Sequence, residues 1–181
     1  MGCDGKPEID LRSKMTFSPQ RGATDCNIRC RIIMEPLSVH AENPTGADNT
    51  SYYQTAIENS SHTQLVLNQT NFENGVKYID KSLEAGHPVL VGVNHALNFG
   101  YNEQTNTTDH YVIIVGKLCE NGEVKYRFWD VGTRKGASED YKFTLMKDKL
   151  FTDRTRKSGH DYTVTQIRRN INNSTGRLIT F

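Results

Sequence analysis

The chain has 181 residues, of which 35% are hydrophobic, so it is long enough to bury the core of one ordinary domain. Its 22 lysine and arginine residues nearly balance 21 acidic residues, and this argues against nucleic-acid binding, which usually requires a basic surface. The longest apolar run, near residues 111–115, is far shorter than the ~20 residues of a membrane span, and the charged first fifteen residues lack the apolar region of a signal peptide.

The first half of the chain is predicted to be helical. Residues 1–15 show no periodicity and are expected to form a loose N-terminal leader. A helix is predicted from Asp25, which can act as its N-cap, to Pro36, which would end it. Its buried stripe is expected to contain three isoleucines, Ile28, Ile32 and Ile33. Residues 49–60 indicate a short helix, and residues 72–86 a longer one capped by Asn71, with Val76, Ile79 and Leu83 in its apolar stripe.

After Gly86 the pattern changes to that of strands. Apolar and β-branched residues predict strands over 87–95, 110–118, 124–130 and 162–170. Asn121-Gly122 is a strong signal for a tight hairpin turn, so the second and third of these strands are expected to pair antiparallel. Helices followed by an antiparallel meander, without an internal repeat, predict an α+β fold with a single domain over residues 16–181.

The four cysteines are too few for a disulfide scaffold. Cys26 and Cys30 are one helical turn apart, which suits packing on one face better than a disulfide bond. Cys3 and Cys119 stand alone, and no second ligand pair at short spacing favours a zinc site. A single cysteine on an apolar helix is most often a core residue, and that alternative remains open for Cys26 at this point.

Cys26 is also well placed to act as a nucleophile. It lies in the first turn after Asp25, where the unpaired N–H groups of a helix favour negative charge and therefore a thiolate. The same N–H groups could hold the oxyanion of a tetrahedral intermediate. Gln20, six positions earlier, could add an amide donor to that oxyanion hole.

His110 is the best candidate for a base among the six histidines. It opens the predicted hairpin and Asp130 closes it, so the two side chains are expected to lie close together. A carboxylate there could accept the imidazole N–H and fix its tautomer, as in catalytic triads. A histidine at a strand end and an aspartate before a loop are more often ordinary surface or turn residues. The combined order of Gln, Cys, His and Asp shifts the balance towards a catalytic site.

This order resembles the papain-like cysteine peptidases, most closely the bacteriocin-processing (double-glycine leader) peptidase family and its stand-alone relatives. The segments that carry the resemblance are "QRGATDC", "GHPVLVGV", "HYVIIVG" and "YRFWDVGT", within residues 18–34 and 86–132. The resemblance implies a papain-like α+β fold in which N-terminal helices pack on an antiparallel β-sheet. It also implies Cys26 as nucleophile, His110 as base, Asp130 as the residue that orients it, and Gln20 as oxyanion donor. The loop over residues 96–109, directly before His110, could form a wall or lid of the cleft.

The predicted function is a cysteine hydrolase, a peptidase or amidase, that cleaves an amide bond through an acyl-enzyme. No metal and no organic cofactor is expected to be needed. The expected substrate is a peptide or peptidoglycan, and an immunity or inhibitor protein is a conceivable partner. Two alternatives stay open: a secreted bacterial effector amidase that attacks the peptide stems of peptidoglycan, and a non-catalytic binding domain that retains the fold. The protein is expected to be soluble, and export without a classical signal peptide would fit the effector alternative.

Overall fold

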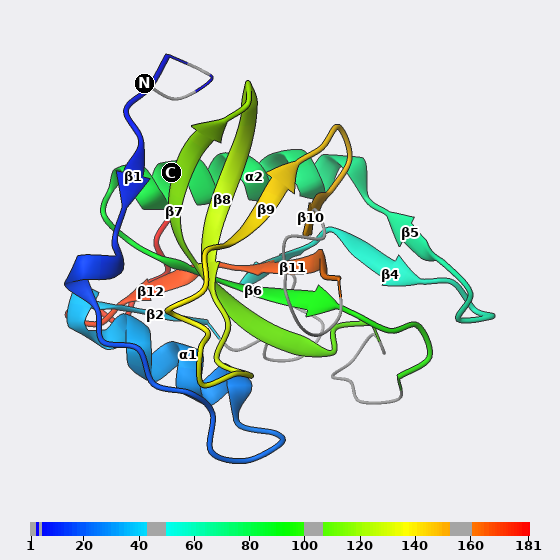
Figure 1. The fold of residues 1–181 in the computed structure, drawn as a ribbon, viewed down its shortest axis with the longest axis horizontal. Helices are drawn as coiled ribbons and strands as arrows, with labels where there is room; N and C mark the ends of the chain where they lie inside the picture. Colours follow the sequence, from blue (N-terminus) through cyan, green and yellow to red (C-terminus); the bar gives the residue numbers. More distant parts are fainter. Residues whose placement is uncertain (1–2, 4, 43–49, 100–106, 153–160) are drawn as a thin grey trace.

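The main body of the molecule is an antiparallel β-barrel (Figure 1). The computed structural model describes residues 3, 5–42, 50–99, 107–152 and 161–181. The barrel strands are β6 (Val89–Asn94), β7 (His110–Glu120), β8 (Glu123–Trp129), β9 (Tyr141–Leu145), β10 (Leu150–Thr152) and β11 (Thr163–Arg168). They are hydrogen-bonded in the order β7-β6-β11-β10-β9-β8, and β8 pairs again with β7, so the described part of the sheet closes on itself.

The predicted papain-like α+β arrangement, with N-terminal helices packed on an antiparallel sheet, is therefore wrong. The described residues form a closed six-stranded barrel and only two α-helices, α1 (Cys26–Met34) and α2 (Gln69–Glu84). Closure depends on β7, which pairs with both of its neighbours. Its first part pairs with β6, from His110 opposite Val93 to Ile114 opposite Val89, and its second part pairs with β8. It also depends on β9 and β10, which the sequence pattern did not predict. Closing the sheet satisfies the hydrogen-bonding groups that open edges would expose.

Short strands and turns surround the barrel. The predicted helix over residues 49–60 is wrong, because this segment contains β3 and β4 instead. Its aromatic and β-branched residues suit a strand, and in β4 the buried Ala56 and Glu58 alternate with the exposed Ile57. The remaining short elements are β1 (Ile9–Asp10), η1 (Arg12–Lys14), η2 (Glu35–Leu37), β2 (Val39–Ala41), β3 (Tyr52–Gln54), β4 (Ala56–Glu58), β5 (Leu65–Leu67) and β12 (Asn170–Asn172). β1 pairs with β7, β3 with β11, β2 with β12, and β4 with β5.

Helix α2 packs against the barrel close to where it was predicted. Its cap is Asn68 rather than Asn71, because the Asn68 side chain accepts the Asn71 N–H at 2.9 Å. Gly86, with φ of 81°, follows the helix end as expected. Asp80 links the helix to the barrel by accepting hydrogen bonds from Lys117 Nζ and the Tyr126 hydroxyl at 2.9 and 2.8 Å.

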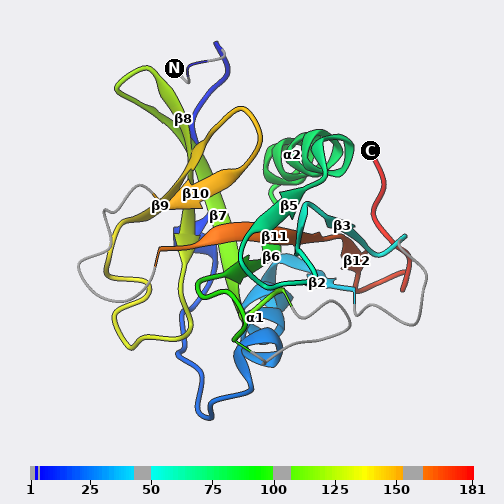
Figure 2. The same cartoon turned by 90° about the vertical axis from the view of Figure 1, so that its right-hand side faces the viewer.

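Helix α1 lies at the opposite end of the molecule from α2 in both views (Figures 1 and 2). Its buried side chains are Cys26, Cys30, Ile33 and Met34. Of the three isoleucines predicted to form the buried stripe, Ile28 and Ile32 are 59% and 43% exposed, so that part of the prediction is wrong. The spacing of residues 26, 30 and 33 is itself helical, and this face packs on β7, where the Cys30 thiol donates to the Tyr111 carbonyl at 3.5 Å.

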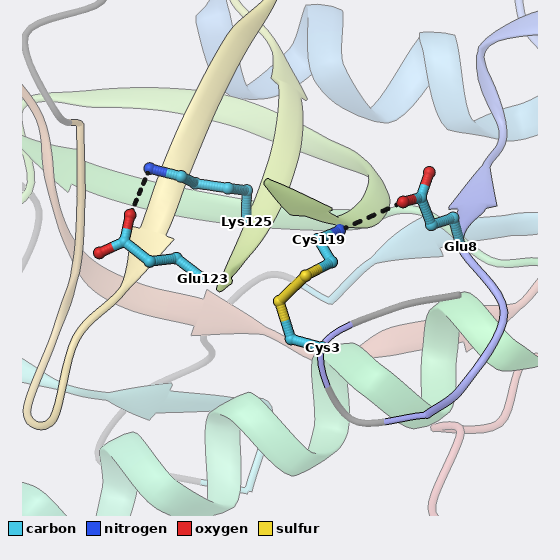
Figure 3. Close-up of a disulfide and its surroundings, with 5 residues drawn as sticks. All are labelled: Cys3, Glu8, Cys119, Glu123 and Lys125. Carbon is cyan, nitrogen blue, oxygen red and sulfur yellow. Dashed lines mark hydrogen bonds and ion pairs between the residues drawn. A yellow bond between two sulfur atoms is a disulfide. The ribbon is translucent and has the colours of Figure 1, made fainter. Parts of the chain in front are cut away.

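The N-terminal segment is tied to the β7–β8 hairpin by a disulfide bond between Cys3 and Cys119 (Figure 3). The two Cα atoms are 5.1 Å apart, and the Glu8 carboxylate accepts the Cys119 N–H at 3.4 Å nearby. Leu11 and Met15 are buried in the core. These residues differ from the loose leader that their lack of periodicity suggested, because a disulfide across 116 positions leaves no local pattern in the sequence.

Candidate active site

The β7–β8 hairpin brings His110 and Asp130 together. Asn121 and Gly122 have φ of 54° and 80°, which is the left-handed backbone that a tight hairpin turn requires. His110 begins β7, and Asp130 directly follows β8. The His110 Nε2 and Asp130 Oδ1 atoms are 2.8 Å apart, so the predicted proximity of these two residues is confirmed.

The Asp130 carboxylate is 1% exposed and is held from several sides. Besides His110, Oδ1 accepts the Gly132 N–H at 2.8 Å, and Oδ2 accepts the Tyr162 hydroxyl at 3.1 Å. A Cβ on Gly132 would lie 3.0 Å from both Asp130 Oδ1 and His110 Nε2, so a larger residue would press on the pair. These contacts fix the carboxylate against the imidazole.

Sequence reasoning missed Tyr162. It was expected only as the first residue of a strand, and its position 32 residues after Asp130 gives no sign of their contact. Its ring also lies 5.9 Å from the His110 ring, centroid to centroid. A tyrosine at the start of a strand that closes a barrel carries no local signal that would distinguish it from a core tyrosine.

Cys26 is the first residue of α1, and its side chain is near enough to the His110 imidazole to contribute to raising the pKa of that ring. The Asp25 carboxylate does not cap the helix; it accepts the N–H groups of Arg21 and Gly22, both at 3.1 Å, and so closes the turn that precedes Cys26. The Asp25 carbonyl accepts the Arg29 N–H at 2.8 Å, so the N–H groups before Arg29 are those that a helix leaves unpaired in its first turn. The thiol therefore lies between a helix N-terminus and an imidazole.

The environment of His110 favours its charged form. Burial of the ring acts to lower its pKa, but the hydrogen bonds to Asp130 and Cys26 and the charges of both groups outweigh burial and raise the pKa to about 9. At neutral pH the ring is thus an imidazolium, with Asp130 on one nitrogen and Cys26 as its other partner. An imidazolium beside a thiol is the arrangement that activates cysteine for nucleophilic attack.

Cys30 has the opposite environment one turn further along the same helix. It is fully buried, and burial first, with the nearby Cys26 and Asp130 charges second, raises the pKa of its thiol well above the ordinary value. It therefore stays protonated and serves as a packing residue. The surroundings of Cys26 and Cys30 are thus different, and the sequence pattern alone did not reveal this difference.

Gln20 lines a pocket of about 310 Å³ together with His110 and Asp130. Its backbone N–H donates to the Val131 carbonyl at 2.8 Å, which ties this residue to the segment after Asp130. Its side-chain Oε1 is buried and has no hydrogen-bond partner among the described residues. A buried acceptor of this kind, on a residue that lines the same pocket as His110, is suited to bind a donor group of a ligand.

The other histidines do not take the place of His110. His95 lies on the pocket wall, but His110 is the residue that pairs with Asp130 and whose pKa is raised by Asp130 and Cys26. His40 and His62 contact Asn173 and Glu58 respectively, and burial lowers the pKa of His87. His160 lies outside the described residues. Phe99 and Asp109, from the loop predicted as a wall or lid, line the pocket; residues 100–106 of that loop also lie outside the described residues.

Within the described ranges, no group of three or more His, Cys, Asp or Glu side chains is arranged to hold a metal ion. None of the described helices is long and apolar enough to cross a membrane. The pocket is lined by the amide of Gln20, the imidazoles of His95 and His110 and the carboxylates of Asp109 and Asp130.

The chain was compared with protein-family models, curated proteins and solved structures, and no match was found in any of the three. The resemblance to the bacteriocin-processing peptidases therefore rests on the sequence motifs alone and stays a prediction.

Proposed function

We propose that the protein is a cysteine hydrolase, a peptidase or amidase, that cleaves an amide bond through an acyl-enzyme. The observation that carries the proposal is the hydrogen bond between His110 and the buried Asp130 at 2.8 Å, together with Cys26, which lies at the start of α1 and acts with Asp130 to raise the pKa of the imidazole. Asp130 is in turn held by Gly132 and Tyr162. Hydrogen bonds of this kind are typical of a catalytic base that a neighbouring carboxylate holds in one orientation.

In the first half-reaction, the Cys26 thiolate attacks the carbonyl carbon of the substrate and forms a C–S bond. The carbonyl oxygen becomes an oxyanion, which the first-turn N–H groups of α1 and the Gln20 amide would stabilise. His110 gives its proton to the leaving nitrogen, the C–N bond breaks, and an amine departs. The thioester and a neutral imidazole remain.

In the second half-reaction, the neutral His110 takes a proton from a water molecule as that water attacks the thioester carbonyl. The tetrahedral intermediate then expels the Cys26 thiolate, and a carboxylic acid is released that ionises at neutral pH. His110 is again an imidazolium and Cys26 a thiolate, so the enzyme returns to its starting state. Asp130 keeps its charge throughout and stabilises the imidazolium.

The proposed substrate is a peptide or the peptide stem of peptidoglycan; the second choice corresponds to a secreted bacterial effector. Both contain amide bonds whose cleavage needs only the residues described, without a metal or organic cofactor. An immunity or inhibitor protein, if one exists, would be expected to cover the pocket beside His110. The amide-cleaving chemistry is proposed from the residues of the site, whereas the choice of substrate rests on analogy with papain-like hydrolases and not on any residue of the site.

A non-catalytic binding domain is the second candidate, and one observation favours it. Cys26 is only 8% exposed, which is the exposure of a packing residue rather than of an open nucleophile. In that case Cys26 would react slowly with alkylating reagents, and substitution of His110 would not change its rate of reaction.

The test is to incubate the purified protein with a mixed peptide library and, separately, with purified peptidoglycan, and to identify products by mass spectrometry. We expect the wild-type protein to release products from one of these substrates, and Cys26→Ala to release none. Cys30→Ala is the matched control, because it removes a thiol from the same helix face, and it should retain turnover if circular dichroism shows a native fold. Wild-type turnover by Cys26→Ala would contradict the proposal.

A further inference from the structure

One wall of the pocket beside His110 consists of aromatic rings. Phe99, His95 and Tyr162 all line it. The ring centroids of His95 and Phe99 are 4.8 Å apart in an edge-to-face arrangement, and those of His95 and Tyr162 are 6.2 Å apart. Tyr162 is fixed by its bond to Asp130, whereas Phe99 is 49% exposed. An aromatic surface therefore runs from Tyr162, which bonds to Asp130, outwards to Phe99.

Two buried carboxylates hold this wall in place. Asp109 Oδ2 accepts the N–H groups of His95 and Ala96 at 2.9 and 3.1 Å. The Glu58 carboxylate accepts the Asn98 N–H at 3.2 and 3.1 Å. Asp109 and Glu58 are 9% and 8% exposed, so these bonds are largely shielded from water. The backbone that presents the rings of His95 and Phe99 is thus organised before any ligand binds, which reduces the entropy lost on binding.

The pocket also leaves room for a ligand. It is lined by the small residues Ala23, Gly132 and Thr133. The volume of about 310 Å³ is at the lower end of the range for small-molecule sites, about 300–1,000 Å³. The space suits one side chain of a substrate rather than a long segment of chain.

The charges around the pocket disfavour an ionised side chain. A cationic group would lie beside the His110 imidazolium, whose pKa is about 9. An acidic group would lie beside the carboxylates of Asp109 and Asp130, which also line the pocket. Asp130 is already paired with His110, and Asp109 accepts the N–H groups of His95 and Ala96, so the protein itself satisfies these charged groups without a charged ligand. A neutral aromatic group can pack edge-to-face or offset against Phe99 and His95 without either conflict.

We infer that this pocket binds a neutral aromatic side chain of the substrate next to the scissile bond, with Phe99 as the specificity-determining residue. The inference rests on the proposed function, because it takes Cys26 and His110 as the reacting groups. It narrows the substrate class from amides in general to those with an aromatic group near the bond that is cleaved.

The test uses a series of iodoacetamides that carry different groups on the amide nitrogen: none, benzyl, 2-ammonioethyl and carboxymethyl. In each reaction the Cys26 thiolate displaces iodide from the methylene carbon, so a C–S bond forms and the C–I bond breaks. Rates are measured by mass spectrometry of the Cys26 peptide and divided by the rate of the same reagent with glutathione. This ratio removes differences in intrinsic reactivity.

We expect the benzyl reagent to alkylate Cys26 about 10-fold or more faster than unsubstituted iodoacetamide, since one large apolar contact is typically worth at least this factor. Phe99→Ala should lose most of this preference. Leu97→Ala is the matched control: it is 39% exposed on the same loop but lines a different pocket with Leu65 and Leu67, and it should retain the preference.

Equal normalised rates for the benzyl and unsubstituted reagents would overturn the inference, while a fast reaction of Cys26 that His110→Gln abolishes would leave the proposed function standing. A preference for the ammonioethyl reagent, or a benzyl preference that Phe99→Ala does not change, would also overturn it. If Cys26 reacts no faster in the wild-type protein than in His110→Gln with every reagent, the proposed function fails together with the inference.

Discussion

The two ends of the β7–β8 hairpin differ in how far their polar residues are buried. At one end, Asp130 is buried beside the partly buried His110, and each oxygen of the carboxylate has a partner. At the other end, beside the turn, the Cys3–Cys119 disulfide lies near ion pairs in which the carboxylate is exposed, such as Glu123, at 57% exposure, with Lys125 in Figure 3. Glu120 at this end is 39% exposed and pairs with Lys142 at 2.6 Å.

This difference indicates which charged groups contribute most to the stability of the molecule. Exposed ion pairs contribute little to stability, typically about 0–1 kcal/mol, because water already solvates both partners. A buried carboxylate needs several hydrogen bonds to offset the loss of water, and Asp130 makes such bonds with His110, Gly132 and Tyr162. The disulfide, by contrast, acts through the covalent connection of distant segments and not through charge.

The largest effect is expected from Asp130→Ala, compared with Glu120→Ala at the other end. Loss of Asp130 leaves Tyr162 and His110 buried without their partner, and breaking a buried pair of this kind typically costs about 3–5 kcal/mol. Glu120→Ala should cost no more than about 1 kcal/mol, since Lys142 retains Asp140 at 3.2 Å. Urea denaturation of both variants measures the difference.

If Asp130→Ala does not fold, Asp130→Asn provides the same comparison with a smaller perturbation. This variant keeps an acceptor for His110 but removes the charge, so alkylation of Cys26 at neutral pH should slow. Equal stabilities for Asp130→Ala and Glu120→Ala would show that burial does not distinguish the two ends.

Removal of the disulfide should have the next largest effect. Native disulfides typically contribute about 2–5 kcal/mol, and a pair separated by 116 positions restricts the unfolded chain strongly. Cys3→Ser is expected to lower the melting temperature, and so is reduction of the wild-type protein, whereas a reductant should have no further effect on the variant. The rate of Cys26 alkylation should stay unchanged, because the disulfide lies at the far end of the hairpin; a large change in that rate would mean that the two ends are coupled.

The charged state of His110 predicts a pH dependence of stability. Its pKa rises from 6.5 in the unfolded chain to about 9 in the folded protein, so the imidazolium stabilises the folded state fully below pH 6.5. This contribution, about 3 kcal/mol for a shift of this size, is lost as the pH rises through about 9. The free energy of unfolding of the wild-type protein relative to His110→Gln should therefore fall between these two pH values. A difference that does not vary with pH would show that Asp130 and Cys26 do not stabilise the imidazolium.

The smallest effect is expected from Tyr162→Phe, which removes one hydrogen bond to Asp130 and keeps the ring. A hydrogen bond to a charged group is typically worth about 1.5–3 kcal/mol, and Asp130 keeps its bonds to His110 and Gly132. We expect alkylation of Cys26 to slow by about 10-fold, and the His110 imidazolium, followed by NMR, to titrate at lower pH. A purely structural tyrosine would change stability without moving that titration.

Local patterns were sufficient for much of the site. The Asn121-Gly122 turn and the apolar strands on each side predicted that His110 and Asp130 would meet, because a two-residue turn fixes the pairing of its strands. The residues before Cys26 predicted the start of α1, and Pro36 predicted its end. For the hairpin, the residues that define the structure are neighbours in the sequence, and a short window contains the information.

Patterns failed where the partner of a segment lies far away in the chain. Residues 49–60 have a composition that a helix or a strand can accept, and pairing of β3 with β11 decided the outcome. The buried face of α1 was also misjudged, since Ile28 and Ile32 are more apolar than Cys26 and Cys30 but point away from β7. An isolated helix does not reveal which of its sides will meet the barrel.

The sequence by itself determined the strands β6, β7, β8 and β11, the turn between β7 and β8, and the order of Gln20, Cys26, His110 and Asp130. These features depend on side-chain periodicity and on backbone preferences at single residues, which act over a few positions. Only the tertiary structure decided that the sheet closes into a barrel, that Cys3 bonds to Cys119, that Tyr162 holds Asp130, and that Cys26 meets His110. Those contacts join segments tens of residues apart, and their free energy arises from burial and strand pairing that exist only once the whole chain has folded.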